Sequence, residues 1–199
     1  MTQPSPVTRP AALPPAALVV VPYDHPEARR LTRALHVEQR ASYGFADSPD
    51  DTPSSEFAPP AGEFVIAQPG PTAQAIACGG WHTLSPGTAE IKRMYVHPDA
   101  RGQALGRQVL THLEASAARA GATRVMLETG RENRAALALY KSFGYRPIAP
   151  YVPGRNEDIN RALAKPLPWH ALRSPTAAGG TLDASTSGST EATGRAPTR

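Results

Sequence analysis

The chain has little cysteine, no long apolar run and no concentrated positive charge, and each shortage narrows its possible function. The single cysteine, Cys78, has no partner for an internal disulfide, so we predict a reducing, cytoplasmic setting. No apolar stretch approaches the ~20 residues that span a bilayer, so no membrane partner is predicted. The net charge is only +4, and basic residues do not cluster between aromatics, which argues against nucleic-acid binding. No histidine or cysteine cluster has the spacing of metal ligands, so no metal is predicted.

Proline and glycine are abundant by contrast, and they crowd toward the two ends of the chain. Of the 199 residues, 22 are proline and 16 are glycine. This distribution predicts a disordered arm over residues 1–16, one folded domain over 17–167 and a disordered low-complexity tail over 168–199. The central part is long enough for a packed core.

Strand and helix patterns alternate within the central part. Strands are predicted over 18–21, 63–67, 72–84, 89–96, 124–128, 145–151 and 160–167. Helices are predicted over 26–42, from the loop after Val96 to Gly121, and over 134–143. Gly79 and Gly80 interrupt one strand, which indicates a bulge or a close backbone approach. The order predicts a mixed α/β (α+β) fold with an antiparallel first half and a helix-crossed second half.

The segment 91–110 carries the strongest chemical signal. An apolar strand ends at Val96, a turn follows at His97–Asp99, and a loop from Arg101 to Gly106 leads directly into a helix. Unpaired N–H groups and the helix dipole both favour an anion at such a place, so a phosphate or pyrophosphate ligand is predicted. The loop has neither the glycine pattern of a Rossmann site nor the G-K-[S/T] of a Walker A loop.

A second motif follows, from Asn133 through Tyr140 to Tyr145. Together with residues 90–106, about thirty residues earlier, it resembles the Gcn5-related N-acetyltransferase (GNAT) superfamily over roughly residues 17–167. The resemblance implies a central, mixed, twisted sheet of about six to seven strands with helices on both faces. It also implies an acyltransferase that transfers an acetyl group from acetyl-CoA to a primary amine of a small molecule or peptide. A homodimer is left open.

The resemblance further implies which residues hold the co-substrate, acetyl-CoA. Backbone groups of Met94, Tyr95 and Val96 would pair with the pantetheine arm and orient the thioester carbonyl. The loop would hold the pyrophosphate, through Arg101, Gly102, Gln103, Ala104, Leu105, Gly106 and Arg107. Asn133 would touch the cofactor, and Arg134 and Lys141 would reach the adenosine phosphate.

Ala104 departs from the family pattern, which usually has glycine at this position. If the backbone there needs a positive φ, alanine costs on the order of 1 kcal/mol relative to glycine. We therefore expect a weakened pyrophosphate pocket, because the N–H of Ala104 is still a donor.

Attack on a thioester requires a neutral amine, so a base must remove a proton. Glu90 matches the position where histone-type members of the superfamily carry a base carboxylate, and we predict that it serves here, with a water relay. The alternative is a solvated carboxylate or one paired with Lys92. The other candidates are Glu63, His82, His97 and Glu128. The tyrosine that matches Tyr140 protonates the departing CoA thiolate in the family; a tyrosine of the core is the alternative.

The acyl acceptor is the least defined part of the prediction. Family members form the acceptor pocket from segments that correspond here to Tyr43–Phe57, Trp81 and Tyr151–Asn160. Four acids make the first segment acidic, namely Asp47, Asp50, Asp51 and Glu56. An acidic rim would attract a cationic amine, and a flexible polar loop is the alternative. A catalytically weak acyl-CoA-binding or regulatory module is the rival to an enzyme.

Overall fold

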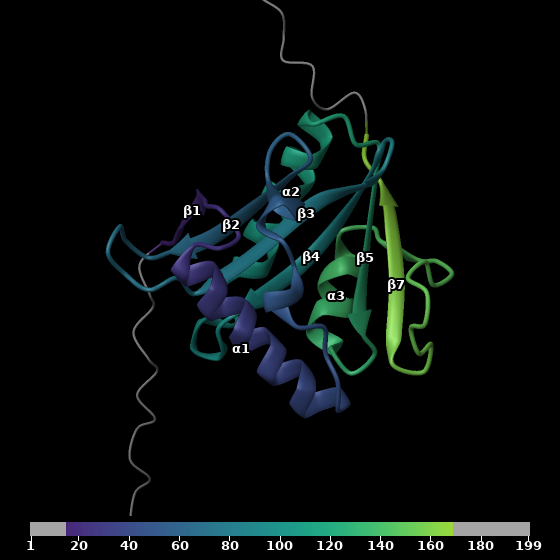
Figure 1. Ribbon diagram of the computed structural model, residues 1–199, viewed down its shortest axis with the longest axis horizontal. Coiled ribbons are helices and arrows are strands. Elements are labelled where there is room, and N and C mark those ends of the chain that lie inside the picture. Colours follow the sequence, from purple (N-terminus) through teal and green to yellow (C-terminus); the bar gives the residue numbers. More distant parts are fainter. Residues whose placement is uncertain (1–14, 169–199) are drawn as a thin grey trace, which may run out of the picture.

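The structure, a computed structural model, describes residues 15–168, so the predicted arm and tail lie almost wholly outside the described residues. The main elements are β1 (Ala17–Val20), α1 (Pro26–Tyr43), β2 (Gly62–Gln68), β3 (Ala77–Ser85), β4 (Thr88–Val96), α2 (Leu105–Arg119), β5 (Arg124–Gly130), α3 (Arg134–Ser142), β6 (Arg146–Pro147) and β7 (Asn160–Pro166) (Figure 1). Short 3-10 turns η1 (Pro49–Asp51), η2 (Ser54–Phe57) and η3 (Pro98–Ala100) join them.

The strands form one seven-stranded sheet in the order β1-β2-β3-β4-β5-β7-β6. All neighbours are antiparallel except β4 and β5, which run parallel because α2 crosses between them. The predicted mixed sheet is therefore confirmed.

Helices cover both faces of this sheet, as predicted (Figure 1). Side chains alternate along β2, so that Val65 packs with Leu113 of α2 while Phe64 packs with Leu31 of α1. Tyr140 places α3 on the same side as α2. The sheet face under α1 is thus distinct from the face under α2 and α3.

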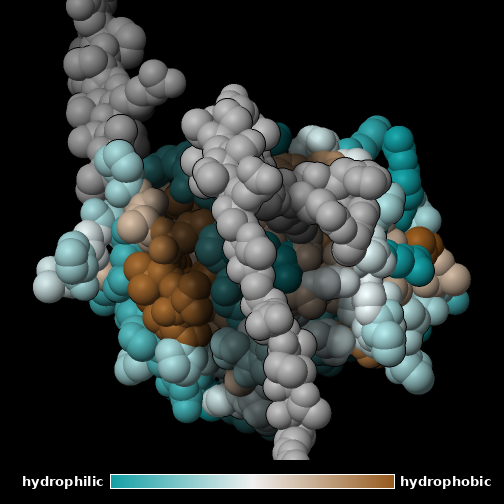
Figure 2. All heavy atoms as spheres, turned by 90° about the horizontal axis from the view of Figure 1, so that it is seen from above, coloured by the Kyte–Doolittle hydropathy of each residue, from teal (hydrophilic) through white to brown (hydrophobic). Residues whose placement is uncertain are grey.

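Both edges of the sheet are short, since β1 has four residues and β6 has two. β1 exposes Val19 and Val20, and apolar surface gathers on that side of the molecule, at the left of Figure 2. Short edge strands offer little template for pairing with another chain.

Two predicted strands differ in extent from the structure. β3 begins at Ala77 rather than at residue 72, because the chain first turns after Pro71. The strand predicted over 145–151 is wrong beyond Pro147. Pro147, Pro150 and Pro153 lack the N–H that a ladder needs, so the chain leaves the sheet and forms a loop before β7.

The pairing of β3 with β4 is interrupted by a bulge. Gly79 of β3 faces two residues of β4, Arg93 and Met94, and Arg93 has a φ of 58°. The extra residue therefore lies in β4 rather than at the two glycines. At Gly80 the close approach is by side chains rather than by backbone, because a Cβ there would lie 2.6 Å from the ring of Phe57.

Candidate active site

β4 and β5 pair over a short stretch and then separate. Their parallel register runs only from Thr88 opposite Arg124 to Glu90 opposite Met126, although the strands continue to Val96 and Gly130. Beyond Glu90 the facing edges have no strand partner in the part of the chain that the structure describes. Such a split can take an extended ligand in the way a sheet takes an added strand.

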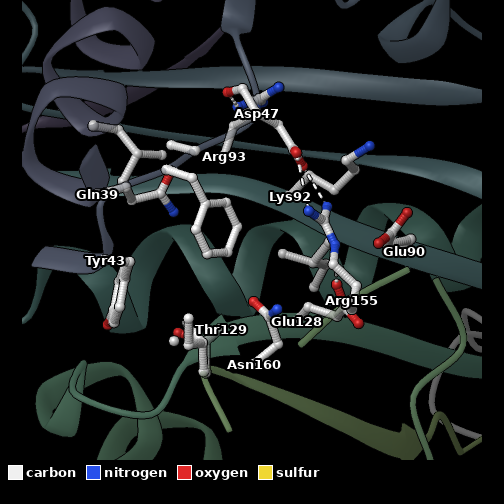
Figure 3. Close-up of a pocket in the computed structure, with 16 residues that line it drawn as sticks. Gln39, Tyr43, Asp47, Glu90, Lys92, Arg93, Glu128, Thr129, Arg155 and Asn160 are labelled. Atoms are coloured by element: carbon white, nitrogen blue, oxygen red, sulfur yellow. Dashed lines mark hydrogen bonds and ion pairs between the residues drawn. The ribbon is translucent and has the colours of Figure 1, made fainter. Parts of the chain in front are cut away.

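A cavity of about 120 Å³ opens beside this split. Its walls come from α1 and the loop after it, from β4 and β5, and from the loop before β7. Figure 3 shows Asp47 and Arg155 meeting across it, with Glu90 at one end and Tyr43 at the other. Segments far apart in the sequence thus form one chamber.

Glu90 lies at the point where the strands separate, and both its oxygens are engaged. His82 contacts Oε2 at 2.7 Å and the hydroxyl of Tyr151 donates to Oε1 at 2.7 Å. Burial alone would raise the pKa of Glu90, but these two bonds and the charge of Lys92 outweigh it and lower the pKa below its ordinary value. The pairing with Lys92, considered as the alternative to a base, does not form, because that ammonium contacts Glu56 at 2.9 Å.

Glu128 stands on the same face of the sheet but in a different environment. Its Oε2 accepts from Nε of Arg155 at 3.1 Å, whereas its Oε1 is buried and has no partner among the described residues. Burial raises the pKa of Glu128, and the charges of Glu90 and Asp47 add to this despite the opposing effect of Arg155. Two neighbouring carboxylates therefore have pKa values shifted in opposite directions.

Arg155 joins the loop before β7 to two other parts of the site. Its guanidinium donates to both carboxylate oxygens of Asp47 in the loop after α1, and to Glu128 in β5. The hydrogen bonds to Asp47, stronger here than the opposing effect of burial, raise the pKa of Arg155. The same bonds lower the pKa of Asp47. From the sequence, Arg155 and Tyr151 fall in the segment expected to form the acceptor pocket, but neither was predicted to act there. A charged residue directly after Gly154, in a proline-rich loop, was the signal that could have indicated Arg155.

The remaining base candidates lie elsewhere. His82 reaches the site only through Glu90. Glu63 pairs with His112 of α2 at 2.8 Å, so it lies on the opposite face of the sheet. His97 is half-buried beyond the end of β4, 3.7 Å from Asp99.

Two further expectations about the acceptor pocket are corrected by the packing. Trp81 is buried against α2, where its indole N–H donates to Ser116 at 3.1 Å, so it does not line the cavity. Most of the acidic rim is neutralised. Three of its acids already have basic partners, in the pairs Asp47–Arg155, Asp50–Arg29 and Glu56–Lys92.

The loop before α2 has the geometry of an anion site. Ala104 is the N-cap of α2 with φ 59° and ψ 12°, so the positive φ considered from the sequence is present. Side chains cap the other two helices, His25 for α1 and Asn133 for α3, whereas no side chain caps α2. Within residues 15–168 no group accepts the N–H of any residue from Gln103 to Arg107. These donors are available to a phosphate.

The side chains around this loop hold its shape. The guanidinium of Arg101 donates to the carbonyl of Val96 and to both oxygens of Glu38 in α1, at 3.1, 2.8 and 2.7 Å. Arg107 stacks on Phe143 at 4.9 Å. Leu105 is buried in the core, and Gly106, Gly102 and Gln103 continue the loop.

Tyr140 reaches the split from α3. Its hydroxyl lies 3.6 Å from the sulfur of Met94, a weak acceptor, and burial raises its pKa, so the proton stays on the oxygen. Tyr95 packs into the core under α1. Met94 of β4 and Tyr140 of α3 thus lie together, whereas the side chain of Asn133 accepts the N–H of Ala136 in its own helix.

Comparison with known proteins gives a consistent picture. The sequence model of the Acetyltransferase (GNAT) family matches residues 28–145. The [ribosomal protein bS18]-alanine N-acetyltransferase of Escherichia coli is 34% identical over 147 residues, 69% of this chain and 93% of its own. An IAA acetyltransferase of Azospirillum brasilense is 33% identical over 105 residues, 52% of this chain and 67% of its own.

The fold has solved counterparts as well. A Klebsiella pneumoniae protein with the provisional name acyl-CoA N-acyltransferase superposes with a TM-score of 0.64 at 28% identity, over 76% of this chain and 97% of that one. No helix among residues 15–168 has both the length and the apolar character that crossing a bilayer requires. The resemblance drawn from the two motifs is confirmed, and the chain belongs to the GNAT family of acetyltransferases.

Proposed function

We propose that this chain transfers an acetyl group from acetyl-CoA to a primary amine of a small molecule or peptide. The observation that carries the proposal is the split between β4 and β5, with an uncapped helix N-terminus at one end and two carboxylates at the other. Two of the relatives are named acetyltransferases, which supports an acetyl group as the group that is transferred.

The donor fits the residues present. The free N–H groups from Gln103 to Arg107 would hold the pyrophosphate at the start of α2. The unpaired edge of β4 at Met94–Val96 would hold the pantetheine arm and orient the thioester carbonyl. Acetyl-CoA supplies the activated acyl carbon.

The proton balance assigns a role to each titratable group. The amine nitrogen attacks the thioester carbon, a C–N bond forms and the C–S bond breaks. The geometry favours Glu128 over Glu90 as the group that takes the amine proton, because Oε1 of Glu128 is free and its pKa is raised. Both oxygens of Glu90 already accept hydrogen bonds, so its role is to orient His82 and Tyr151.

Tyr140 would donate the proton that the departing CoA sulfur takes up. Among residues 15–168 its hydroxyl has only the thioether of Met94 as a hydrogen-bond partner, so it is free to donate to the departing thiolate. A thiolate leaves readily without help, so we expect a modest contribution from this acid.

The test is the release of CoA thiol from acetyl-CoA that depends on an added amine, measured for the wild type and three variants. Glu128→Gln should lower kcat by about 10²–10⁴, Glu90→Gln by less, and Tyr140→Phe by the least. Tight CoA binding without amine-dependent release for any amine would refute the transferase and favour the acyl-CoA-binding module. A larger loss in Glu90→Gln than in Glu128→Gln would return the base to Glu90.

A further inference from the structure

The cavity contains as many basic as acidic side chains, and each base already has a hydrogen-bond acceptor. Its bases are Lys92, Arg93 and Arg155, and its acids are Asp47, Glu90 and Glu128. Lys92 contacts Glu56, outside the cavity lining. Arg93 donates to the carbonyls of Asp47 and Ser48 and to the hydroxyl of Thr52. Each base therefore has an acceptor within the protein.

The acids leave a single opening for a cation. Both oxygens of Asp47 accept from Arg155, and both oxygens of Glu90 accept from His82 or Tyr151. Only Oε1 of Glu128 is without a partner among the described residues. With Glu56 included, four acids face three bases around this cavity, so one net negative charge is left and one ammonium group, but not a second, can be neutralised.

The opposite wall is mostly apolar, with Gln39 of α1 as a polar exception (Figure 3). Leu35 and Tyr43 of α1 and Phe45 of the following loop line the cavity, with Ile159 facing from the loop before β7. Phe45 is 41% exposed and lies at the rim. The body of an acceptor would therefore rest against aliphatic and aromatic groups.

We propose that Arg155 determines acceptor specificity by occupying the place of a second cation, so that the site takes a compact primary monoamine with an apolar body. This inference rests on the proposed acetyl transfer. The guanidinium already donates to both oxygens of Asp47 and to one oxygen of Glu128. A diamine would bury its second ammonium without a counter-ion, which is strongly unfavourable. The site would then discriminate between a monoamine and a diamine through the missing counter-ion of the second ammonium as much as through the apolar contacts.

The experiment compares kcat/KM for butylamine and 1,4-diaminobutane, which differ only in the second ammonium. The wild type should favour butylamine by about tenfold or more. Arg155→Gln frees Asp47, so the ratio should fall toward one, and the ratio cancels any loss of rate common to both amines. Arg33→Gln is the matched control, because it removes an arginine–aspartate pair on the outside of α1 and should leave the ratio unchanged.

Three results would overturn the proposal: a wild type that prefers the diamine, a folded Arg155→Gln with an unchanged ratio, or an equal change in Arg33→Gln. If Arg155→Gln does not fold, Asp47→Asn decides. It leaves spare positive charge in the cavity and should widen the preference for butylamine; a narrower preference overturns the idea. If no amine releases CoA, acetyl transfer is refuted. The preference is then measured by binding, as the rise in Tm that butylamine and 1,4-diaminobutane each cause in the presence of CoA, and a larger rise with the diamine overturns the proposal.

Discussion

Replacing Ala104 with glycine tests whether the start of α2 is strained. The residue has φ 59° and its side chain is exposed, so loss of the methyl group removes no packing. A left-handed conformation costs an L-residue about 1–2 kcal/mol, and glycine does not bear this cost. Glycine has more freedom in the unfolded chain, which offsets about 0.4–1 kcal/mol of the gain. The net expectation is a stabilisation of about 0.5–1 kcal/mol.

The change is measurable by thermal and denaturant unfolding. For a domain of about 150–250 residues, 1 kcal/mol shifts Tm by about 2–4 °C, so Ala104→Gly should raise Tm by about 1–4 °C. The denaturant m-value should not change, because the same surface is exposed on unfolding. The N–H donor of residue 104 is kept, so the affinity for CoA should be equal or higher.

Gly102→Ala is the matched control in the same loop. Gly102 has φ 80° and nothing lies within 4 Å of an added Cβ, so only the backbone conformation resists the substitution. It should lower the free energy of unfolding by about 0.5–1 kcal/mol, the opposite sign. A lower Tm for Ala104→Gly, or the same direction for both variants, would refute the argument from left-handed strain.

Three other variants test separate parts of the molecule. Trp81→Phe removes the hydrogen bond of a buried indole and should destabilise the fold by about 1–2 kcal/mol, with KM for the amine unchanged because Trp81 lies on the other face of the sheet; a changed KM would place it in the pocket. Only the carboxylate form of Glu128 accepts a proton, so kcat/KM should be lost as the pH falls through its pKa, and burial moves that loss above the ordinary value of about 4.3; Glu128→Gln should abolish this limb of the pH profile, and its persistence would assign the limb to another group. Gly130→Ala places a methyl group against the ring of Tyr43 and should cost about 1–3 kcal/mol and alter KM, whereas Gly70→Ala, with open space around it, should change neither.

The element order could be predicted because it depends on neighbouring residues. Gly44 and Gly144 follow α1 and α3 with positive φ, and Asn133 caps α3 through its own side chain. The positive φ at Ala104 was considered only as a condition, from the glycine that the family usually has at this position, and the structure has it. Reasoning from neighbouring residues failed for the strand over 145–151, where apolar residues indicated a strand but the prolines removed its donors.

The electrostatics of the site could not be predicted in this way, because they depend on which charges meet. The sequence shows four acids near one another after α1 and suggests a negative rim. The partner of Asp47 is Arg155, 108 residues later, and no local pattern links the two. Their pairing removes Asp47 from the acidic rim and leaves Oε1 of Glu128 without a partner among the described residues. If the site takes the monoamine proposed above, its selectivity depends on which carboxylate oxygen stays without a partner and not on the number of acids, and only the folded chain determines which oxygen that is.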